Sequence, residues 1–237
     1  MNKLPILMYH NVGPAETDSV GLCISKAKLE QQFDFLSKNE YVTFHFSELD
    51  KINDLPKKSI ILTFDDVTEN QLLYAVPLLE KYNLKACFFI PFSYIGMKDL
   101  WNFGSEKIMT IDQLKELNPE QIELGYHSFE HKKYDSMSEE AIQKDFLDCN
   151  DIIKNNDLKV FCSLAYPYGN YPRELAEKQK FKKIMQENGI KYGLKIGNRP
   201  NKFPFKDDFE IKRIDIKGED SLFSFKLKLK FGKLKLF

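Results

Sequence analysis

The sequence lacks three features whose absence narrows its class: an excess of one charge, a long apolar run, and closely spaced cysteines. Lys and Arg together number 35, as do Asp and Glu, so the formal net charge is zero. A neutral chain has no general attraction for nucleic acid, and we expect no nucleic-acid partner. No stretch reaches the roughly 20 apolar residues that span a bilayer, so we expect no transmembrane helix.

The N-terminus also lacks the features of a secretory leader. The apolar run over residues 4–9 is too short for the core of a signal peptide, and no small-residue cleavage site follows it. We therefore expect a cytoplasmic protein. No CxxC spacing is present, so we expect all four cysteines to be reduced and structural. They are Cys23, Cys87, Cys149 and Cys162.

What is present is the composition of an ordinary globular protein. The chain has 237 residues, of which 43% are hydrophobic and 30% are charged. That length is ample for a substantial core. Because no internal repeat or Gly/Ser-rich linker divides the chain, we expect one catalytic domain over residues 1–220. A basic tail over residues 221–237 follows it.

Short apolar runs alternate with amphipathic stretches along the chain. Strands are predicted over residues 5–10, 59–64, 85–91, 121–126, 160–166, 191–196 and 210–216. Helices are predicted over residues 25–38, 69–82, 110–117, 138–155 and 171–188. This alternation predicts βαβ units and a mainly parallel sheet. The pattern alone allows an open sheet or a barrel, and the length is slightly short for an eight-fold barrel.

Residues suited to hydrolytic chemistry follow four of the predicted strands. They are His10, the aspartates of TFDD (63–66), the histidines of HSFEH (127–131) and the segment AYPYG (165–169). Each group alone is commoner as an ordinary strand end or turn. The carboxyl ends of parallel strands meet at one edge, however, so four groups together favour a single site. If HSFEH forms a helical turn, its i,i+4 spacing puts both imidazoles on one side, which suits a divalent metal.

At these residues the chain resembles the polysaccharide deacetylases of carbohydrate esterase family four, which have the NodB-homology fold. TFDD, HSFEH and AYPYG are similar to the first three family motifs in order and spacing, and the resemblance runs over residues 5–216. It implies an α/β fold, a distorted (β/α) barrel with fewer than eight repeats. It also implies metal-dependent removal of acetyl groups from N-acetylated sugars during the synthesis of a cell-surface polysaccharide.

The resemblance also implies roles for individual residues. Asp65 would be the general base, and the backbone N–H of Tyr168 would help bind the oxyanion. The segment LPILMYHNV resembles a branch with a circularly permuted site, which includes enzymes acting on poly-N-acetylglucosamine. In that branch His10 would be the general acid. The metal would be Zn²⁺ in the first place, with Co²⁺ or Ni²⁺ as alternatives, and its ligands would be Asp66, His127 and His131.

The chain departs from the family pattern at several positions. Val67 stands where the family usually has Gly, and Ala165 stands where it often has an Arg that tethers the base. We expect Arg213, in KRIDI, to replace that Arg. The family's Trp-containing fourth motif has no good match. Five aromatic residues are expected either to stack on sugar rings or to lie in the core. They are Trp101, Tyr126, Tyr166, Tyr168 and Tyr171.

The C-terminal sequence LFSFKLKLKFGKLKLF (222–237) alternates apolar residues with lysine. Strict alternation favours a strand with one wet face. A helix is also possible but has a poorer apolar stripe. The functional alternative is an anchor to an anionic membrane surface, which would suit an enzyme peripheral to the inner membrane and acting on a lipid-linked sugar.

Two other functions use the same residues. The motifs also suit a deformylase or another amidohydrolase acting on a lipid-linked sugar. A carbohydrate-binding domain that has lost catalytic activity would fit Val67, Ala165 and the missing fourth motif.

Overall fold

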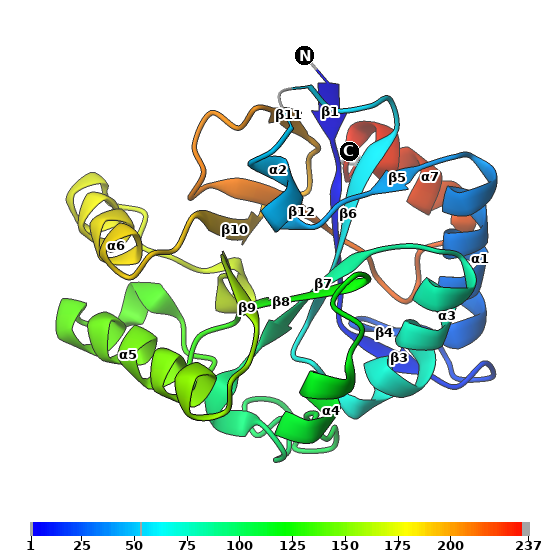
Figure 1. The fold of residues 1–237 in the computed structure, drawn as a ribbon. Helices are drawn as coiled ribbons and strands as arrows, with labels where there is room; N and C mark the ends of the chain where they lie inside the picture. The colour runs from blue at the N-terminus through cyan, green and yellow to red at the C-terminus, as the bar shows by residue number, and fades with distance from the viewer. Residues whose placement is uncertain (1, 53, 234–237) are drawn as a thin grey trace.

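The computed structural model describes residues 2–52 and 54–233 (Figure 1). A parallel barrel forms its centre. Seven strands pair in the order β2-β12-β10-β9-β8-β7-β6, and β6 pairs with β2 to close the circle. They are β2 (Ile6–Tyr9), β6 (Ser59–Asp65), β7 (Ala86–Ile90), β8 (Ile122–Tyr126), β9 (Val160–Ala165), β10 (Tyr192–Ile196) and β12 (Ile211–Asp215). The prediction of a distorted barrel with fewer than eight repeats is confirmed.

Short strands flank the barrel. β5 (Val42–Thr43) extends the sheet beside β6, while β1 (Asn2–Leu4) pairs antiparallel with β11 (Asn201–Phe203). β3 (Asn11–Gly13) and β4 (Cys23–Ser25) pair with each other just beyond β2. These additions leave the closed ring of seven parallel strands unchanged.

Helices cover the outside of the barrel. Figure 1 shows α1, α3 and α7 along one side and α5 and α6 along the other. The α-helices are α1 (Lys26–Lys38), α2 (Phe46–Leu49), α3 (Val76–Lys81), α4 (Ile111–Glu116), α5 (Glu139–Asn155), α6 (Leu175–Glu187) and α7 (Leu222–Phe231). Single turns of other helix types are η1 (Gln71–Ala75), η2 (Phe92–Tyr94), η3 (Tyr134–Ser136) and η4 (Pro167–Gly169). None of the helices in residues 2–52 and 54–233 is long and apolar enough to cross a membrane.

The helix starts follow the local sequence. Ser25 and Ser138 cap α1 and α5 by accepting hydrogen bonds from backbone N–H groups three residues on. Thr110 and Gln113 form the predicted capping box of α4. Each cap satisfies backbone donors that have no partner within the helix, so these boundaries could be predicted from sequence.

Two predicted helices differ from the observed elements for reasons that involve proline. The predicted helix over 69–82 is divided into the π-helical turn η1 and the helix α3. Pro77 has no backbone N–H, and the N–H of Val76 donates to the carbonyl of Gln71, five residues back. The predicted helix over 171–188 begins only at Leu175, since Pro172 disfavours helical conformation at Tyr171.

The prediction of a C-terminal strand is wrong, because residues 222–231 form the helix α7. A closed barrel offers that segment no free strand edge on which to pair. Instead, Phe225 and Leu229 lie one helical turn apart and are buried, and Phe225 meets Phe35 of α1 edge-on with ring centroids 6.2 Å apart. Residues 234–237 of the predicted tail lie outside the described residues.

The barrel interior positions the site. Alternate residues of each strand point inward, and near the amino ends these are apolar side chains such as Ile61, Cys87 and Ile211. Along β6 and β12 the same inward face continues to Asp65 and Arg213 at the carboxyl ends. The interior is therefore filled with apolar side chains near the amino ends of the strands and is polar near their carboxyl ends.

Candidate metal and catalytic site

The predicted site residues lie at the carboxyl ends of the barrel strands. The structure brings together His10 after β2, Asp65 and Asp66 at the end of β6, His127 and His131 after β8, Tyr168 after β9, and Arg213 on β12. Contacts link all seven residues into one group. Their convergence follows from the parallel topology, which places every one of these strand ends at the same rim.

Three of these residues form a compact cluster of potential metal ligands. Oδ1 of Asp66 lies 3.5 Å from Nε2 of His127 and 3.4 Å from Nε2 of His131, and the two Nε2 atoms are 3.2 Å apart. A tetrahedral ion with ligands at roughly 2.0–2.1 Å needs separations of about 3.3–3.4 Å between donor atoms. The three donors therefore have the spacing that a divalent ion such as Zn²⁺ requires.

The protonation of the cluster also suits a metal. Nδ1 of His127 lies 2.7 Å from the carbonyl oxygen of Ala165, which can only accept, so Nδ1 donates and Nε2 keeps its lone pair for the cluster. Burial lowers the pKa of His127 to about 4, so this imidazole is neutral near pH 7. Oδ1 of Asp66 is buried and makes no hydrogen bond to the described part of the chain.

The backbone around the cluster adopts conformations that are uncommon for residues with side chains. Ten non-glycine residues in the described ranges have positive φ. Half of them lie at this site: Asp66, Val67, Ser128, His131 and Tyr168. The φ of 77° at Asp66 turns the chain at the end of β6, so two adjacent aspartates that would face opposite ways in a strand reach one pocket.

The HSFEH segment is not helical, so its two imidazoles converge for a different reason. Ser128 and His131 have φ values of 65° and 54°, which fold the segment back on itself. Asp145 of α5 holds this loop through two hydrogen bonds. Its Oδ1 accepts the backbone N–H of Phe129 at 2.8 Å, and its Oδ2 accepts the hydroxyl of Tyr134 at 2.9 Å. Burial raises the pKa of Asp145 to about 6.

Sequence reasoning missed Asp145, although a signal was present. Its side chain lies among the buried residues of α5, alongside Ile142, Phe146 and Cys149. An acidic residue on the apolar face of an amphipathic helix must find hydrogen-bond donors when it is buried. The helical pattern could therefore have flagged it.

Asp65 and Arg213 form a bidentate ion pair inside the barrel mouth. The guanidinium nitrogens lie 2.5 and 2.8 Å from the two carboxylate oxygens, and both side chains are almost completely buried. Burial works to raise the pKa of Asp65. The positive charge of Arg213 and its hydrogen bonds outweigh it and hold that pKa well below the ordinary value of a carboxyl group. Arg213 thus lies where a tether for the base is needed, while Ala165 contributes its carbonyl to His127.

His10 approaches the Asp65 carboxylate next to the metal cluster. Its Nε2 is 3.6 Å from Oδ2 of Asp65, and His127 approaches the same oxygen at 3.9 Å. Nδ1 of His10 is buried and makes no hydrogen bond within the described ranges. One carboxylate oxygen therefore lies near two imidazoles, one of which belongs to the candidate metal cluster.

Aromatic side chains line one side of the cluster. Trp101 stacks on the imidazole of His131 with ring centroids 4.3 Å apart, and Tyr168 meets the same ring edge-on at 4.8 Å. The Tyr168 side chain is 50% exposed and so can contact a sugar ring. The three other aromatic residues considered for stacking are buried in the core: Tyr126, Tyr166 and Tyr171.

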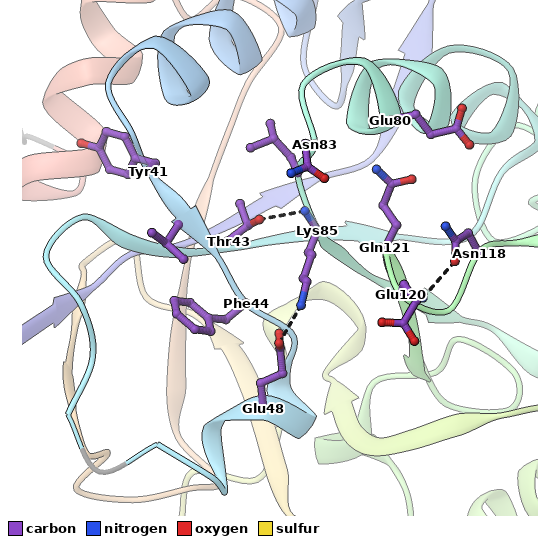
Figure 2. Close-up of a pocket in the computed structure, with 12 residues that line it drawn as sticks. Tyr41, Thr43, Phe44, Glu48, Glu80, Asn83, Lys85, Asn118, Glu120 and Gln121 are labelled. Atoms are coloured by element: carbon purple, nitrogen blue, oxygen red, sulfur yellow. Dashed lines mark hydrogen bonds and ion pairs between the residues drawn. The ribbon is translucent and has the colours of Figure 1, made fainter.

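A cavity of about 670 Å³ lies away from this site, at the amino ends of the strands. Its lining includes Thr43 of β5 and residues that immediately precede β7 and β8, namely Lys85 and Gln121. Figure 2 shows Lys85 between Thr43 and Glu48, and the ammonium group of Lys85 pairs with the Glu48 carboxylate at 2.6 Å. None of the seven predicted site residues lines this cavity. The candidate catalytic residues therefore lie at the opposite end of the barrel.

The family model and the most similar curated proteins that we compared point to the same family. Residues 52–192 match the model of a family described as polysaccharide deacetylase. YxkH of Bacillus subtilis is 27% identical over 176 residues, which cover 73% of this chain and 59% of that protein. The poly-β-1,6-N-acetyl-D-glucosamine N-deacetylase of Staphylococcus epidermidis is 27% identical over 198 residues, covering 78% and 62% respectively. The chain thus spans about three fifths of these relatives.

The fold has a close counterpart among solved structures. The Streptococcus pyogenes deacetylase PplD, solved in complex with acetate, superposes with a TM-score of 0.78 at 24% identity. The superposition covers 96% of this chain and 98% of that one. At this level of identity the likeness supports the barrel fold.

Proposed function

This chain is a member of the polysaccharide deacetylase family, and from that premise we propose that it hydrolyses the N-acetyl group of an N-acetylated sugar and releases acetate. The substrate is a polysaccharide or a glycan precursor. The observation that carries the proposal is the cluster of Asp66, His127 and His131 beside the Asp65–Arg213 pair. A three-ligand donor set that leaves room for water is typical of catalytic metal sites.

The side chains of this site divide the proton transfers between them. An acetamide resists hydrolysis because water is a weak nucleophile and an amine anion is a very poor leaving group. Asp65, kept ionised by Arg213, accepts a proton as water oxygen bonds to the carbonyl carbon. His10 then donates a proton to the nitrogen as the C–N bond breaks. Acetate and a free sugar amine are the products.

Groups around these side chains stabilise the oxyanion and orient the sugar. The backbone N–H of Tyr168, in the left-handed turn after β9, binds the oxyanion, and one such donor typically contributes about 10²–10³ in rate. Asp66, His127 and His131 would hold a divalent ion, which would supply Lewis-acid chemistry by polarising the carbonyl and making water acidic enough for a weak base such as Asp65. Trp101 and Tyr168 offer ring faces beside His131 for the sugar.

Acetate release from N-acetylglucosamine oligomers tests the proposal. The Zn²⁺-loaded wild-type protein should release acetate, and Asp65→Asn should reduce kcat by at least about 10³-fold because it removes the base. Asp151→Asn, a change at an exposed position of α5, serves as the control and should leave kcat unchanged. Release of formate from an N-formylated sugar, with none of acetate, would instead support a deformylase.

We further propose that the outward face of α7 contacts an anionic membrane surface. Phe223 and Phe231 are exposed on this helix, and Lys226 and Lys230 are exposed between them. Exposed aromatic residues interleaved with lysines suit a membrane surface, where the aromatic rings enter the apolar region and the lysines contact anionic headgroups. Such a contact would place the enzyme beside a lipid-linked glycan.

A further inference from the structure

Gln71 connects the two chain segments that carry His10 and Asp65. It is the first residue of the π-helical turn η1, and its side chain is fully buried. Its amide nitrogen donates to the carbonyl oxygen of His10 at 3.0 Å and to that of Asp65 at 2.6 Å. One NH₂ group thus holds two backbone carbonyls from segments more than 50 residues apart in the sequence.

These hydrogen bonds lie where the strand ladder ends. β2 and β6 pair in parallel register up to Tyr9 opposite Phe64. The next residues on each strand are His10 and Asp65, which lie beyond the last ladder pair. Gln71 therefore replaces the missing ladder contact at the position where the candidate acid and base must keep a fixed separation.

The preceding residue holds the same segment. Oδ1 of Asn70 accepts the backbone N–H of Val12 at 3.0 Å, and its Nδ2 donates to the side chain of Asn11 at 3.0 Å. Residues 10–12 are thus held by two consecutive side chains of the turn that follows TFDD. The wide π-helical turn sets where these two side chains point.

The buried amide of Gln71 also carries a cost. Its Oε1 has no hydrogen-bond partner in the described part of the chain. A buried acceptor without a partner destabilises the folded chain, and an apolar residue of the same size would avoid that cost. The two N–H donors are what such a residue could not supply.

We propose that Gln71 is a positioning residue that holds the His10 imidazole in place beside the Asp65 carboxylate. The inference rests on the proposed deacetylase function. Without the two hydrogen bonds from Gln71, the end of β2 can shift relative to β6. A displacement of about 1 Å can reduce a rate by about 10²-fold. The loss falls on the step in which His10 protonates the departing nitrogen.

A comparison of two substrates isolates that step. An amide nitrogen must gain a proton to leave, whereas the phenolate of 4-nitrophenyl acetate leaves without one. Gln71→Met keeps the side-chain size but removes both donors. It should lower kcat/KM on N-acetylglucosamine oligomers by about 10–100-fold and on the ester by less than about threefold. Gln71→Asn, which keeps the NH₂ group on a shorter side chain, should show a smaller loss of the same kind.

Two further measurements exclude a general loss of structure. Gln32→Met replaces an equally buried glutamine of α1, which accepts the Tyr9 hydroxyl, and should leave the amide-to-ester ratio unchanged. In a double-mutant cycle, Gln71→Met should add little to His10→Ala, because both remove the same proton transfer. Equal losses on amide and ester, or fully additive losses, would overturn the inference.

The structure of Gln71→Met provides a readout that needs no turnover. The separation between His10 Nε2 and Asp65 Oδ2, 3.6 Å in the wild-type chain, should increase or become variable. An unchanged separation contradicts the inference even if the wild-type protein proves inactive on the oligomer. Absence of wild-type acetate release contradicts the proposed function instead, so the two failures are distinguishable.

Discussion

At the scale of single residues, the Asp65–Arg213 pair dominates the electrostatics of the barrel mouth. Both groups are removed from water, and each is compensated only by the other and by neighbouring polar groups. A buried pair of this kind contributes little net stability compared with apolar residues, but the loss of one partner leaves a buried charge uncompensated. The pair therefore makes the site sensitive to substitution of either residue.

Arg213→Met should lower the free energy of unfolding by about 3–5 kcal/mol, because Asp65 would be left as an unpaired buried carboxylate. Arg213→Lys should cost less, since it keeps the charge but not the two-pronged hydrogen bonding. Urea denaturation at pH 7 measures both. Equal stability of wild type and Arg213→Met would show that the pair does not hold Asp65 ionised.

Asp145 gives the chain a pH-dependent stability whose sign is opposite to that of Asp65. The pKa of Asp145 is raised to about 6, whereas an unfolded carboxyl titrates near about 4. Between these values the folded state binds more protons than the unfolded state, so the contribution of Asp145 to stability falls as pH rises. The fall should amount to about 2–3 kcal/mol for a shift of this size.

A comparison of wild type with Asp145→Asn isolates this contribution. Asn can still accept from the Phe129 N–H but does not titrate. The difference in unfolding free energy, wild type minus variant, should decrease from about pH 4 to pH 6 and then level off. If the unfolding free energies of wild type and variant change in parallel between about pH 4 and pH 6, the pKa of Asp145 is not raised.

Sequence could identify the chemistry-bearing residues and the Arg213 tether, but not the hydrogen bonds that hold the surrounding loops. His10, Asp65 and His127 follow apolar runs, and parallel topology brings strand ends together whatever the loops do. Gln71 and Asp145 act through hydrogen bonds to the backbone of other segments, Gln71 to His10 and Asp145 to Phe129. The amphipathic pattern of α5 marks Asp145 as a buried acid, but no local pattern identifies its partners or those of Gln71, because they depend on loop paths that only tertiary packing determines.

At the scale of elements, the short helix α2 forms a plug at the amino end of the barrel. Glu123 of β8 points into the interior, and its carboxylate accepts the backbone N–H groups of Phe46 and Ser47 at 2.9 and 3.1 Å. These are the first N–H groups of α2, which have no partner within the helix. The carboxylate therefore fixes the plug to the barrel wall.

Glu123→Ala should lower the free energy of unfolding by about 2–4 kcal/mol, because two buried N–H donors would lose a charged acceptor. The catalytic rate per folded molecule should not change, since the site lies at the other end of the barrel. Urea denaturation and kcat measured on the same samples check both parts. A fall in kcat without a loss of stability would contradict this division between the two ends.

The C-terminal helix shows why alternation alone misled the sequence prediction. Lys228 falls at an inward position of α7, where a strand pattern would have put a solvated side chain. Its ammonium group donates to the carbonyl of Asp215 at 2.7 Å and pairs with Asp220. A lysine with buried partners of this kind is indistinguishable in sequence from an exposed one.

The proposed membrane contact of α7 is best tested by point changes, since deleting the helix would also expose Phe35 of α1. Phe223→Ser combined with Lys230→Glu should abolish co-sedimentation with anionic vesicles. Lys57→Glu, at an exposed position outside α7, is the control for net charge. Wild-type protein that fails to bind these vesicles, or a double variant that still binds, would contradict the contact.

At the scale of the whole molecule, the two ends of the chain complete the site. β2 lies between β12 and β6, so the strand that carries Arg213, the segment that carries His10 and the strand that carries Asp65 are neighbours in the barrel. Both residues lie outside the 52–192 segment that matches the family model. The family motifs in the middle of the chain thus supply the candidate metal cluster and the proposed base, and the terminal strands supply the proposed tether and acid.

Sequence could predict the strand order only in part. Alternating patterns predicted parallel βαβ units, but closure requires β2 and β6 to pair at a register that no local pattern specifies. The resemblance to the deacetylases supplied the closed form. The family match and the barrel agree with that resemblance. The π-helical turn η1 and the positive φ of Val67 are departures from local sequence preference, and both lie next to the candidate site.

The central claim is that Asp66, His127 and His131 hold one divalent ion that the hydrolysis requires. Calorimetry with chelator-stripped protein should show one Zn²⁺ bound per chain, weakened at least about 100-fold in His131→Ala, and acetate release from N-acetylglucosamine oligomers should return with that one equivalent. Release that proceeds fully in the stripped protein, or Zn²⁺ binding that His131→Ala leaves unchanged, would contradict the account.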